Sequence, residues 1–196
     1  MILPILAYGD SVLRKTAKVI EPGEKGLEEL IVNMFETMYN AHGVGLAAPQ
    51  VGKSLRLFIV DASIYAKDDD DETVSKEERS KLKNFKRTFI NAKMIEENGE
   101  KWPFNEGCLS IPKIREDVLR PPQIRISYVD DKFQRHEESF TGLAARIIQH
   151  EYDHIEGKLF TDRINPLRRR LLKGKLDDIS KGKVDVDYKM KFPKSR

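Results

Sequence analysis

The segment Gln149-His-Glu-Tyr-Asp-His154 constrains this chain more than any other feature of its sequence. Histidines four residues apart in a helix lie one turn apart on the same face, so both rings can bind one ion. Leu143 and Ile147 precede them at helical spacing, Thr141 can cap the helix, and Gly157 can end it. The sequence therefore predicts a helix that carries a metal site.

A catalytic ion needs three protein ligands and one open position, whereas four protein ligands make a closed structural site. His150 and His154 supply two ligands, and the third must come from elsewhere in the chain. The candidates are the two other histidines, carboxylates such as Glu106 and Asp153, and the single thiol, Cys108. Cys108 is preferred because Gly107 lets the backbone bend tightly before it and Pro112 limits extension after it, so that a fixed bend can present the thiol.

Glu151 lies between the two histidines and points to a different side of the predicted helix. It can therefore reach a water on the metal instead of the metal itself, take a proton from that water and deliver it later. These residues predict a metal-dependent hydrolase without specifying the bond that it cleaves.

Length and composition predict one catalytic domain that spans residues 1–196. The chain has 39% apolar and 34% charged residues, no apolar run near the roughly 18 residues of a membrane span, and no signal-peptide pattern at its start. Its lone cysteine fits a reducing compartment, so we expect a cytoplasmic protein. The net charge of +3 is too small to predict general binding to nucleic acid.

Patterns of apolar residues predict several further elements. Residues 27–39 have the apolar stripe of a half-buried helix, followed by Gly43 as a stop, and 54–61 can form a buried strand. An antiparallel hairpin is expected at 124–128 and 135–140.

Three segments have the composition of a molecular surface. Residues 62–87 are rich in charge and read as a solvated insertion, partly helical near 77–85. Asn165 and Pro166 are a favoured start for a last, basic helix. The tail near 182–196 is polar, and we expect it to be loose.

Three motifs in order resemble the peptide deformylase family: Gly43-Val-Gly-Leu-Ala-Ala-Pro-Gln50, Glu106-Gly-Cys-Leu-Ser110 and the histidine segment. The resemblance runs from residues 13–15 to the last helix. It implies an α+β fold in which small antiparallel sheets surround the metal-binding helix, with a C-terminal helix. It also implies removal of the formyl group from the initiator methionine of nascent chains, with release of formate.

The resemblance assigns Cys108, His150 and His154 as metal ligands. It favours Fe²⁺ as the physiological ion, with Zn²⁺, Ni²⁺ or Co²⁺ as ions that could replace it in a purified sample. A thiolate ligand is compatible with both iron and zinc.

The resemblance also assigns Glu151 as general acid/base, and Gln50 and the backbone amide of Leu109 as donors to the oxyanion. In this mechanism a metal-bound hydroxide attacks the formyl carbon, and Glu151 protonates the departing amine.

The methionine pocket of the family matches a set of mainly apolar residues. These substrate-binding candidates are Val44, Gly45, Phe104, Leu143 and Ile147. Arg146 stands where many relatives have an apolar residue near the pocket rim. It could narrow the pocket mouth, or pair with a substrate carbonyl or an acidic neighbour.

Two other readings share the histidine motif. A zincin-type metalloprotease takes its third ligand downstream of the helix, where this chain has no histidine but has Glu156 and Asp162. A ribosome-binding module with a structural metal would use the basic residues 168–170. Transient ribosome contact and hydrolysis can coexist, with N-formylmethionyl peptides as substrate.

Overall fold

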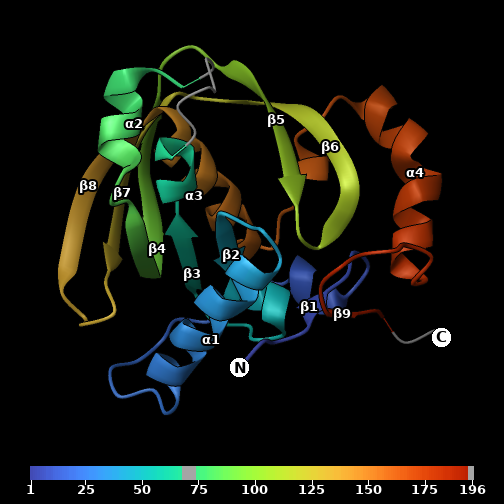
Figure 1. Cartoon of the computed structure of the whole chain (residues 1–196), viewed down its shortest axis with the longest axis horizontal. Helices are drawn as coiled ribbons and strands as arrows, with labels where there is room; N and C mark the ends of the chain where they lie inside the picture. Colours follow the sequence, from blue (N-terminus) through green and yellow to red (C-terminus); the bar gives the residue numbers. More distant parts are fainter. Residues whose placement is uncertain (68–73, 194–196) are drawn as a thin grey trace.

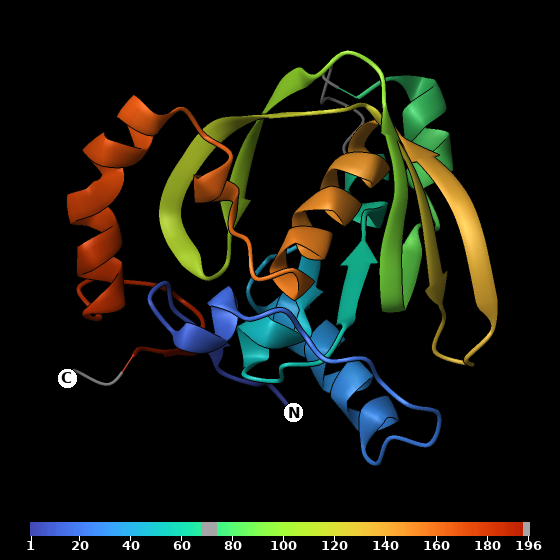
Figure 2. The same cartoon turned by 180° about the vertical axis from the view of Figure 1, so that it is seen from behind.

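The computed structural model describes residues 1–67 and 74–193. Its centre is helix α3, Gly142–Ile155, in which every residue except Gly142 and Tyr152 is buried. Figure 2 shows α3 between a twisted two-stranded ribbon on one side and a larger sheet on the other. The predicted helix is therefore confirmed, and its many polar residues need partners inside the protein.

The larger sheet has five antiparallel strands in the order β2-β3-β4-β7-β8. Its strands are β2 (Gly45–Ala47), β3 (Leu57–Asp61), β4 (Lys86–Asn98), β7 (Gln123–Val129) and β8 (Arg135–Thr141). Strands β7 and β8 form the predicted hairpin, and β3 lies within the predicted strand at 54–61. Buried apolar side chains of β3, β4 and β7 pack with those of α3 in one core cluster.

The ribbon on the other side of α3 consists of β5 (Trp102–Cys108) and β6 (Ile111–Arg120). The sequence patterns predict no strand within residues 102–120, although buried and exposed residues alternate along β6. A register shift follows Gly107, after which Cys108 pairs with Ile111 and leaves a two-residue turn. This turn holds the cysteine motif at the end of a strand.

Two short strands near the ends of the chain lie side by side (Figure 1). Strand β1 (Ile5–Leu6) pairs in parallel with β9 (Met190–Lys191). Residues 182–193, for which the sequence analysis expects a loose tail, thus contain a strand. The reason is that Tyr188, Met190 and Phe192 pack their side chains against the core at every second position.

Three further α-helices and four 3₁₀ turns complete the described part of the chain. They are α1 (Leu27–Asn40), α2 (Lys76–Leu82), α4 (Pro166–Ser180) and the 3₁₀ turns η1 (Ser11–Arg14), η2 (Ala48–Val51), η3 (Ser63–Ala66) and η4 (Phe160–Asp162). The predicted first and last helices are confirmed. Asn165 caps α4 by accepting a hydrogen bond from Leu167 N at 2.8 Å. After α1, His42 and not Gly43 adopts the left-handed conformation, with φ of 54°.

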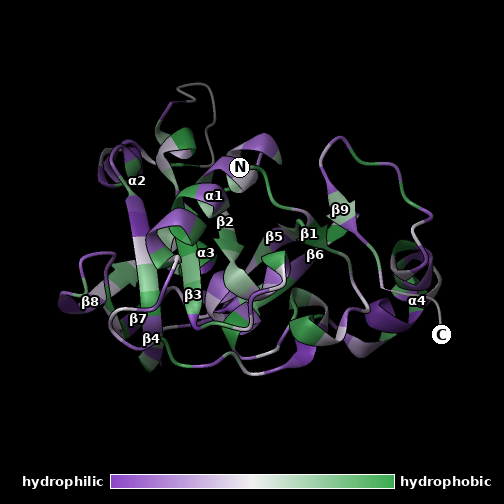
Figure 3. Cartoon of the chain, turned by 90° about the horizontal axis from the view of Figure 1, so that it is seen from below, coloured by the Kyte–Doolittle hydropathy of each residue, from purple (hydrophilic) through white to green (hydrophobic). Residues whose placement is uncertain are grey.

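The charged insertion is more than a solvated loop. Residues 68–71, its acidic run, lie outside the described residues, but Val74, Leu82 and Phe85 are buried in the core next to α3. Figure 3 shows hydrophobic colour over β3 and a mixture of hydrophilic and hydrophobic colour on α4 at the margin. None of the helices in the described ranges is long and apolar enough to cross a membrane.

Candidate metal centre

The structure brings together the three predicted metal ligands. Ligand atoms of Cys108, His150 and His154 all lie within 4.8 Å of one another. Cys108 Sγ is 3.3 Å from His154 Nε2, and the two imidazole centroids are 5.1 Å apart. One thiol and two imidazoles are a donor set that suits a transition-metal ion and leaves a coordination position open.

Glu106, which the sequence analysis weighs as a ligand, instead supports one. Its Oε2 lies 2.9 Å from His150 Nδ1. A carboxylate on one ring nitrogen leaves the other, Nε2, to face an ion, which is the usual arrangement behind a metal-binding histidine. Although burial opposes its ionisation, hydrogen bonds from His150 and Arg120 hold the pKa of Glu106 well below its usual range.

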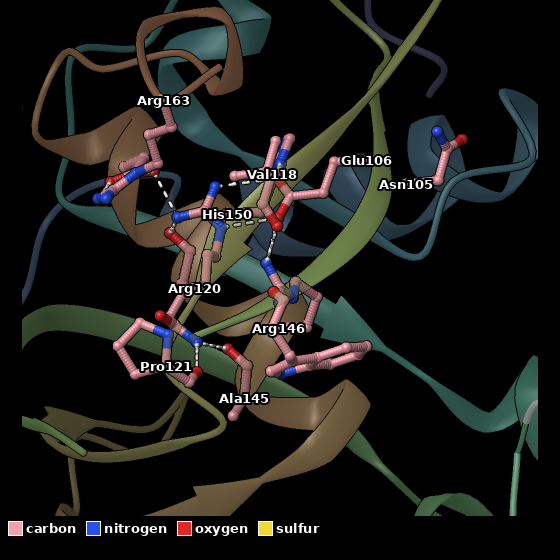
Figure 4. A network of polar contacts seen from close by, with 12 residues as sticks. Asn105, Glu106, Val118, Arg120, Pro121, Ala145, Arg146, His150 and Arg163 are labelled. Carbon is pink, nitrogen blue, oxygen red and sulfur yellow. Dashed lines mark hydrogen bonds and ion pairs between the residues drawn. The ribbon is translucent and has the colours of Figure 1, made fainter. Parts of the chain in front are cut away.

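Two buried arginines neutralise Glu106 (Figure 4). Arg120 donates to both carboxylate oxygens, at 2.7 and 2.9 Å, and Arg146 donates to Oε1 at 3.0 Å. Arg120 also bonds Asp153 at 2.7 Å, which in turn pairs with Arg163. A charge buried this deeply is tolerated only when it is paired, so the network fixes β5, β6 and α3 relative to one another.

The two histidines differ in their electrostatics. Burial lowers the pKa of His154 well below its usual value, which favours the neutral ring that a metal requires. Burial also disfavours the charged form of His150, but its contacts with Cys108 and Glu106 outweigh this and raise its pKa. His154 Nδ1 is buried without a hydrogen-bond partner among the described residues.

Glu151 lines the same cavity as Cys108 and His150 and is 4% exposed. Burial raises the pKa of its carboxyl to about 7, so it can both take and give a proton near neutral pH. Its Oε2 has no hydrogen-bond partner among the described residues. The carboxylate is therefore available to a reacting molecule.

Gly45 explains why the first motif needs a glycine at that position. A Cβ built on Gly45 would lie 2.8 Å from both Cγ and Cδ of Glu151. Strand β2 thus contacts the Glu151 side chain through bare backbone, and any larger residue would push the carboxyl away.

The two predicted oxyanion donors belong to adjoining segments. Gln50 is 2% exposed, and its Oε1 accepts a hydrogen bond from Ala47 N at 2.8 Å. This bond points Nε2 toward the β5–β6 turn, where it lies 3.5 Å from Cys108 Sγ and 3.3 Å from Ser110 Oγ. Leu109, which follows Cys108 in that turn, lines the same cavity.

The cavity has a volume of about 690 Å³. Val44, Gly45, Phe104 and Ile147 line it, as the sequence analysis expects of a substrate pocket. Leu143 lies in the core, 6% exposed, and is not among the residues that line this cavity in the described part of the chain.

Arg146 also borders the cavity, but it is 2% exposed. The structure shows one of the roles expected for Arg146, pairing with an acidic neighbour, and this neighbour is Glu106. Arg146 also donates to the Trp102 carbonyl at 2.7 Å, and its guanidinium lies over the Trp102 ring at 4.5 Å. These contacts hold it away from solvent.

Two supports of the site were missed in the sequence. Thr141 occupies the cap position of α3, but its side chain makes no capping hydrogen bond. Glu78 of α2 accepts from Leu143 N at 2.6 Å instead. The C-terminal residues 185–188 line the cavity, and strict alternation of apolar and polar residues from Val184 to Phe192 is the signal that could have predicted their extended conformation.

Comparison with known proteins agrees with this geometry. The family model of polypeptide deformylase matches residues 2–170. The chain is 57% identical to a peptide deformylase of Christiangramia forsetii over 196 residues, covering 100% of this chain and 98% of that one. A peptide deformylase of Flavobacterium psychrophilum is 58% identical, with 100% of both chains covered. A crystal structure of a peptide deformylase from Legionella pneumophila superposes with a TM-score of 0.76 at 37% identity, covering 93% of this chain and 98% of that one.

Proposed function

The chain belongs to the polypeptide deformylase family of metal-dependent hydrolases, and from this premise we propose how its residues remove the formyl group from N-formylmethionyl peptides of nascent chains. The observation that carries the proposal is the convergence of Cys108, His150 and His154, of which Cys108 and His150 line one cavity together with Glu151. The three ligands would hold a divalent ion. When bound, this ion supplies Lewis acidity and makes a water acidic enough to lose its proton near neutral pH.

Glu151 moves the proton in this scheme. Its buried carboxylate accepts a proton from the attacking water, whose oxygen forms the new bond to the formyl carbon. The C–N bond then breaks, and Glu151 gives its proton to the departing nitrogen. The products are formate and a free α-amine.

Gln50 and Leu109 stabilise the charge that develops on the formyl oxygen. Gln50 Nε2 and the Leu109 N–H are donors already held in place before the substrate binds, so little reorganisation is required during the reaction. The accepting group of Gln50 is occupied by Ala47 N, which keeps the donor end toward the cavity.

The methionine side chain of the substrate would contact the apolar wall formed by Val44, Phe104 and Ile147. Gly45 would lie along the substrate backbone, and Leu143 would support the wall from the core. We propose that Arg146 shapes this pocket through its stacking on Trp102 and Phe104.

Fe²⁺ is the ion that we propose for the cell, because a thiolate and two imidazoles suit iron and the family resemblance favours it. The homologues in Christiangramia and Flavobacterium are bacterial, so we place the enzyme in a bacterial cytoplasm, where nascent chains emerge.

Leu167 and Leu171 of α4 are each 66% exposed among basic residues. This mixed surface supports the proposed transient contact of α4 with the ribosome, which ribosome co-sedimentation of Leu171→Glu would test.

A zincin-type protease is the weaker alternative. Its downstream ligand would have to be Glu156 or Asp162, but Glu156 pairs with Arg56 at 2.7 Å and Asp162 pairs with Arg14. Neither belongs to the cluster of potential ligand atoms.

The test is to purify the protein without oxygen, quantify its bound metal and measure formate release from formyl-Met-Ala-Ser. We expect formate release by the wild type and little metal or turnover in Cys108→Ser, because a hydroxyl is a poor replacement for a thiolate. A metal-loaded wild type that releases no formate would contradict the proposal. Full activity in Cys108→Ser would remove Cys108 from the ligand set.

A further inference from the structure

The turn between β5 and β6 is held by segments that are distant in sequence. Its residues are Leu109, a proposed oxyanion donor, and Ser110, which is fully buried. A turn with only its own strands for support can shift by the fraction of an ångström that matters to an oxyanion donor. The contacts around this turn therefore bear on catalysis.

The N-terminal segment and the first motif hold one side of the turn. Tyr8 N donates to the Ser110 carbonyl at 2.8 Å, and Gln50 Nε2 lies 3.3 Å from Ser110 Oγ. The Leu109 side chain packs against Gly43, where an added Cβ would lie 2.8 Å from Leu109 Cδ1. These three contacts do not involve the Leu109 carbonyl, which is held from another side.

The C-terminal segment provides that contact. Tyr188 OH donates to the Leu109 carbonyl oxygen at 2.8 Å. Tyr188 is half-buried, lines the cavity and packs against the same core cluster as Leu109. It lies beyond residues 2–170, the part of the chain that the family model matches.

The position of Tyr188 is itself determined by the strand pair of the two chain ends. Ile5 N donates to the Lys189 carbonyl and Ala7 N donates to the Lys191 carbonyl, both at 2.9 Å. The same segment then continues to Tyr8, which bonds Ser110. One parallel pair, β1 with β9, thus delivers a tyrosine hydroxyl to Leu109 and a backbone amide to Ser110.

We propose that Tyr188 is a positioning residue for the deformylase reaction: by holding the Leu109 carbonyl it fixes the β5–β6 turn, so that the Leu109 N–H, which belongs to the preceding peptide group, faces the developing oxyanion. This inference rests on the proposed function of Leu109. Tyr188 itself exchanges no proton with the substrate. Its contribution is the fixed orientation of the turn, and it should therefore affect kcat more than KM.

The test compares Tyr188→Phe with Tyr39→Phe, a matched control. Tyr39 OH donates to Asp61 Oδ2 at 2.6 Å and is not among the cavity-lining residues of the described chain. Loss of one neutral hydrogen bond should lower kcat for formyl-Met-Ala-Ser roughly fivefold in Tyr188→Phe, with KM and bound metal unchanged. Tyr39→Phe should keep the kcat of the wild type.

A second readout does not depend on turnover. Amide hydrogen exchange at Leu109 and Ser110 should be roughly fivefold faster in Tyr188→Phe and unchanged in Tyr39→Phe. Unchanged kcat and unchanged exchange in Tyr188→Phe, beside an active wild type, would overturn the positioning role alone. Equal slowing of turnover in both variants would also overturn it, because the effect would then be general. A wild type that holds metal but releases no formate would instead contradict the proposed function.

Discussion

At the scale of single residues, the contact between Gly45 and Glu151 is the most demanding in the site. The absence of a side chain at Gly45 lets β2 approach the catalytic carboxyl. The glycine-rich motif could be recognised in the sequence, but its partner could not, because Glu151 lies more than 100 residues away along the chain. The spacing of the histidines was sufficient to predict two candidate ligands, since residues four apart in a helix lie one turn apart on the same face.

Replacing Gly45 by alanine should displace the Glu151 carboxyl and lower kcat by roughly 10²-fold, because general acid/base catalysis depends on that position. Bound metal should stay at the wild-type level, since the three ligands are not touched. Gly174→Ala is the control: a Cβ there meets nothing within 4 Å, and alanine favours a helix. Wild-type turnover in Gly45→Ala would show that Glu151 has room to adjust.

Glu106 supports a second prediction at this scale. Glu106→Gln keeps an acceptor for His150 but removes the charge, so metal affinity should fall roughly 10- to 100-fold in a competition titration with a chelator. Glu106→Ala should also destabilise the fold, by about 3–5 kcal/mol, because Arg120 and Arg146 lose a buried partner. Unchanged metal affinity in Glu106→Gln would show that its charge does not reach the ion through His150.

At the scale of elements, the sequence was informative where one element carries a complete pattern. The helix stripe of α1, the cap of α4 and the β7–β8 hairpin are local signals. Strands β5 and β6 were missed because Trp102 to Cys108 holds a proline and a glycine, and because five of the ten residues of β6 are charged, two of them buried. Their stability comes from pairing with each other and from the buried Arg120, which no local pattern reveals.

The cap of α3 leads to a prediction about how α2 stabilises this helix. Glu78 of α2 accepts a hydrogen bond from the first turn of α3, so Glu78→Ala should lower the free energy of unfolding by about 1 kcal/mol in urea denaturation. Thr141→Ala should change it less, because the Thr141 side chain makes no capping hydrogen bond. The reverse order of these two effects would assign the cap to Thr141.

At the scale of the whole molecule, three separate structures meet at one cavity. The large sheet places Gly45, the ribbon places Cys108, and the paired chain ends place Tyr188. The α+β architecture could be expected from resemblance, whereas the closure of the site by both termini depends on pairing between residues about 185 positions apart. Such contacts leave only a weak trace in a single sequence.

This arrangement predicts that the ion stabilises the entire fold. The proposed ligands come from α3 and β5 and would converge on it, so removal of the metal by a chelator should lower the melting temperature in calorimetry by several degrees. Restoring the metal should reverse the change. An identical melting temperature with and without metal would show that the three ligands are held without the ion's help.

We propose that Glu151 transfers protons beside an ion that Cys108, His150 and His154 would hold. The most direct measurement is formate release by Glu151→Gln at a metal content matched to the wild type. We predict that this variant keeps its bound ion and loses roughly 10²- to 10⁴-fold in kcat. Wild-type kcat in metal-loaded Glu151→Gln would contradict the account.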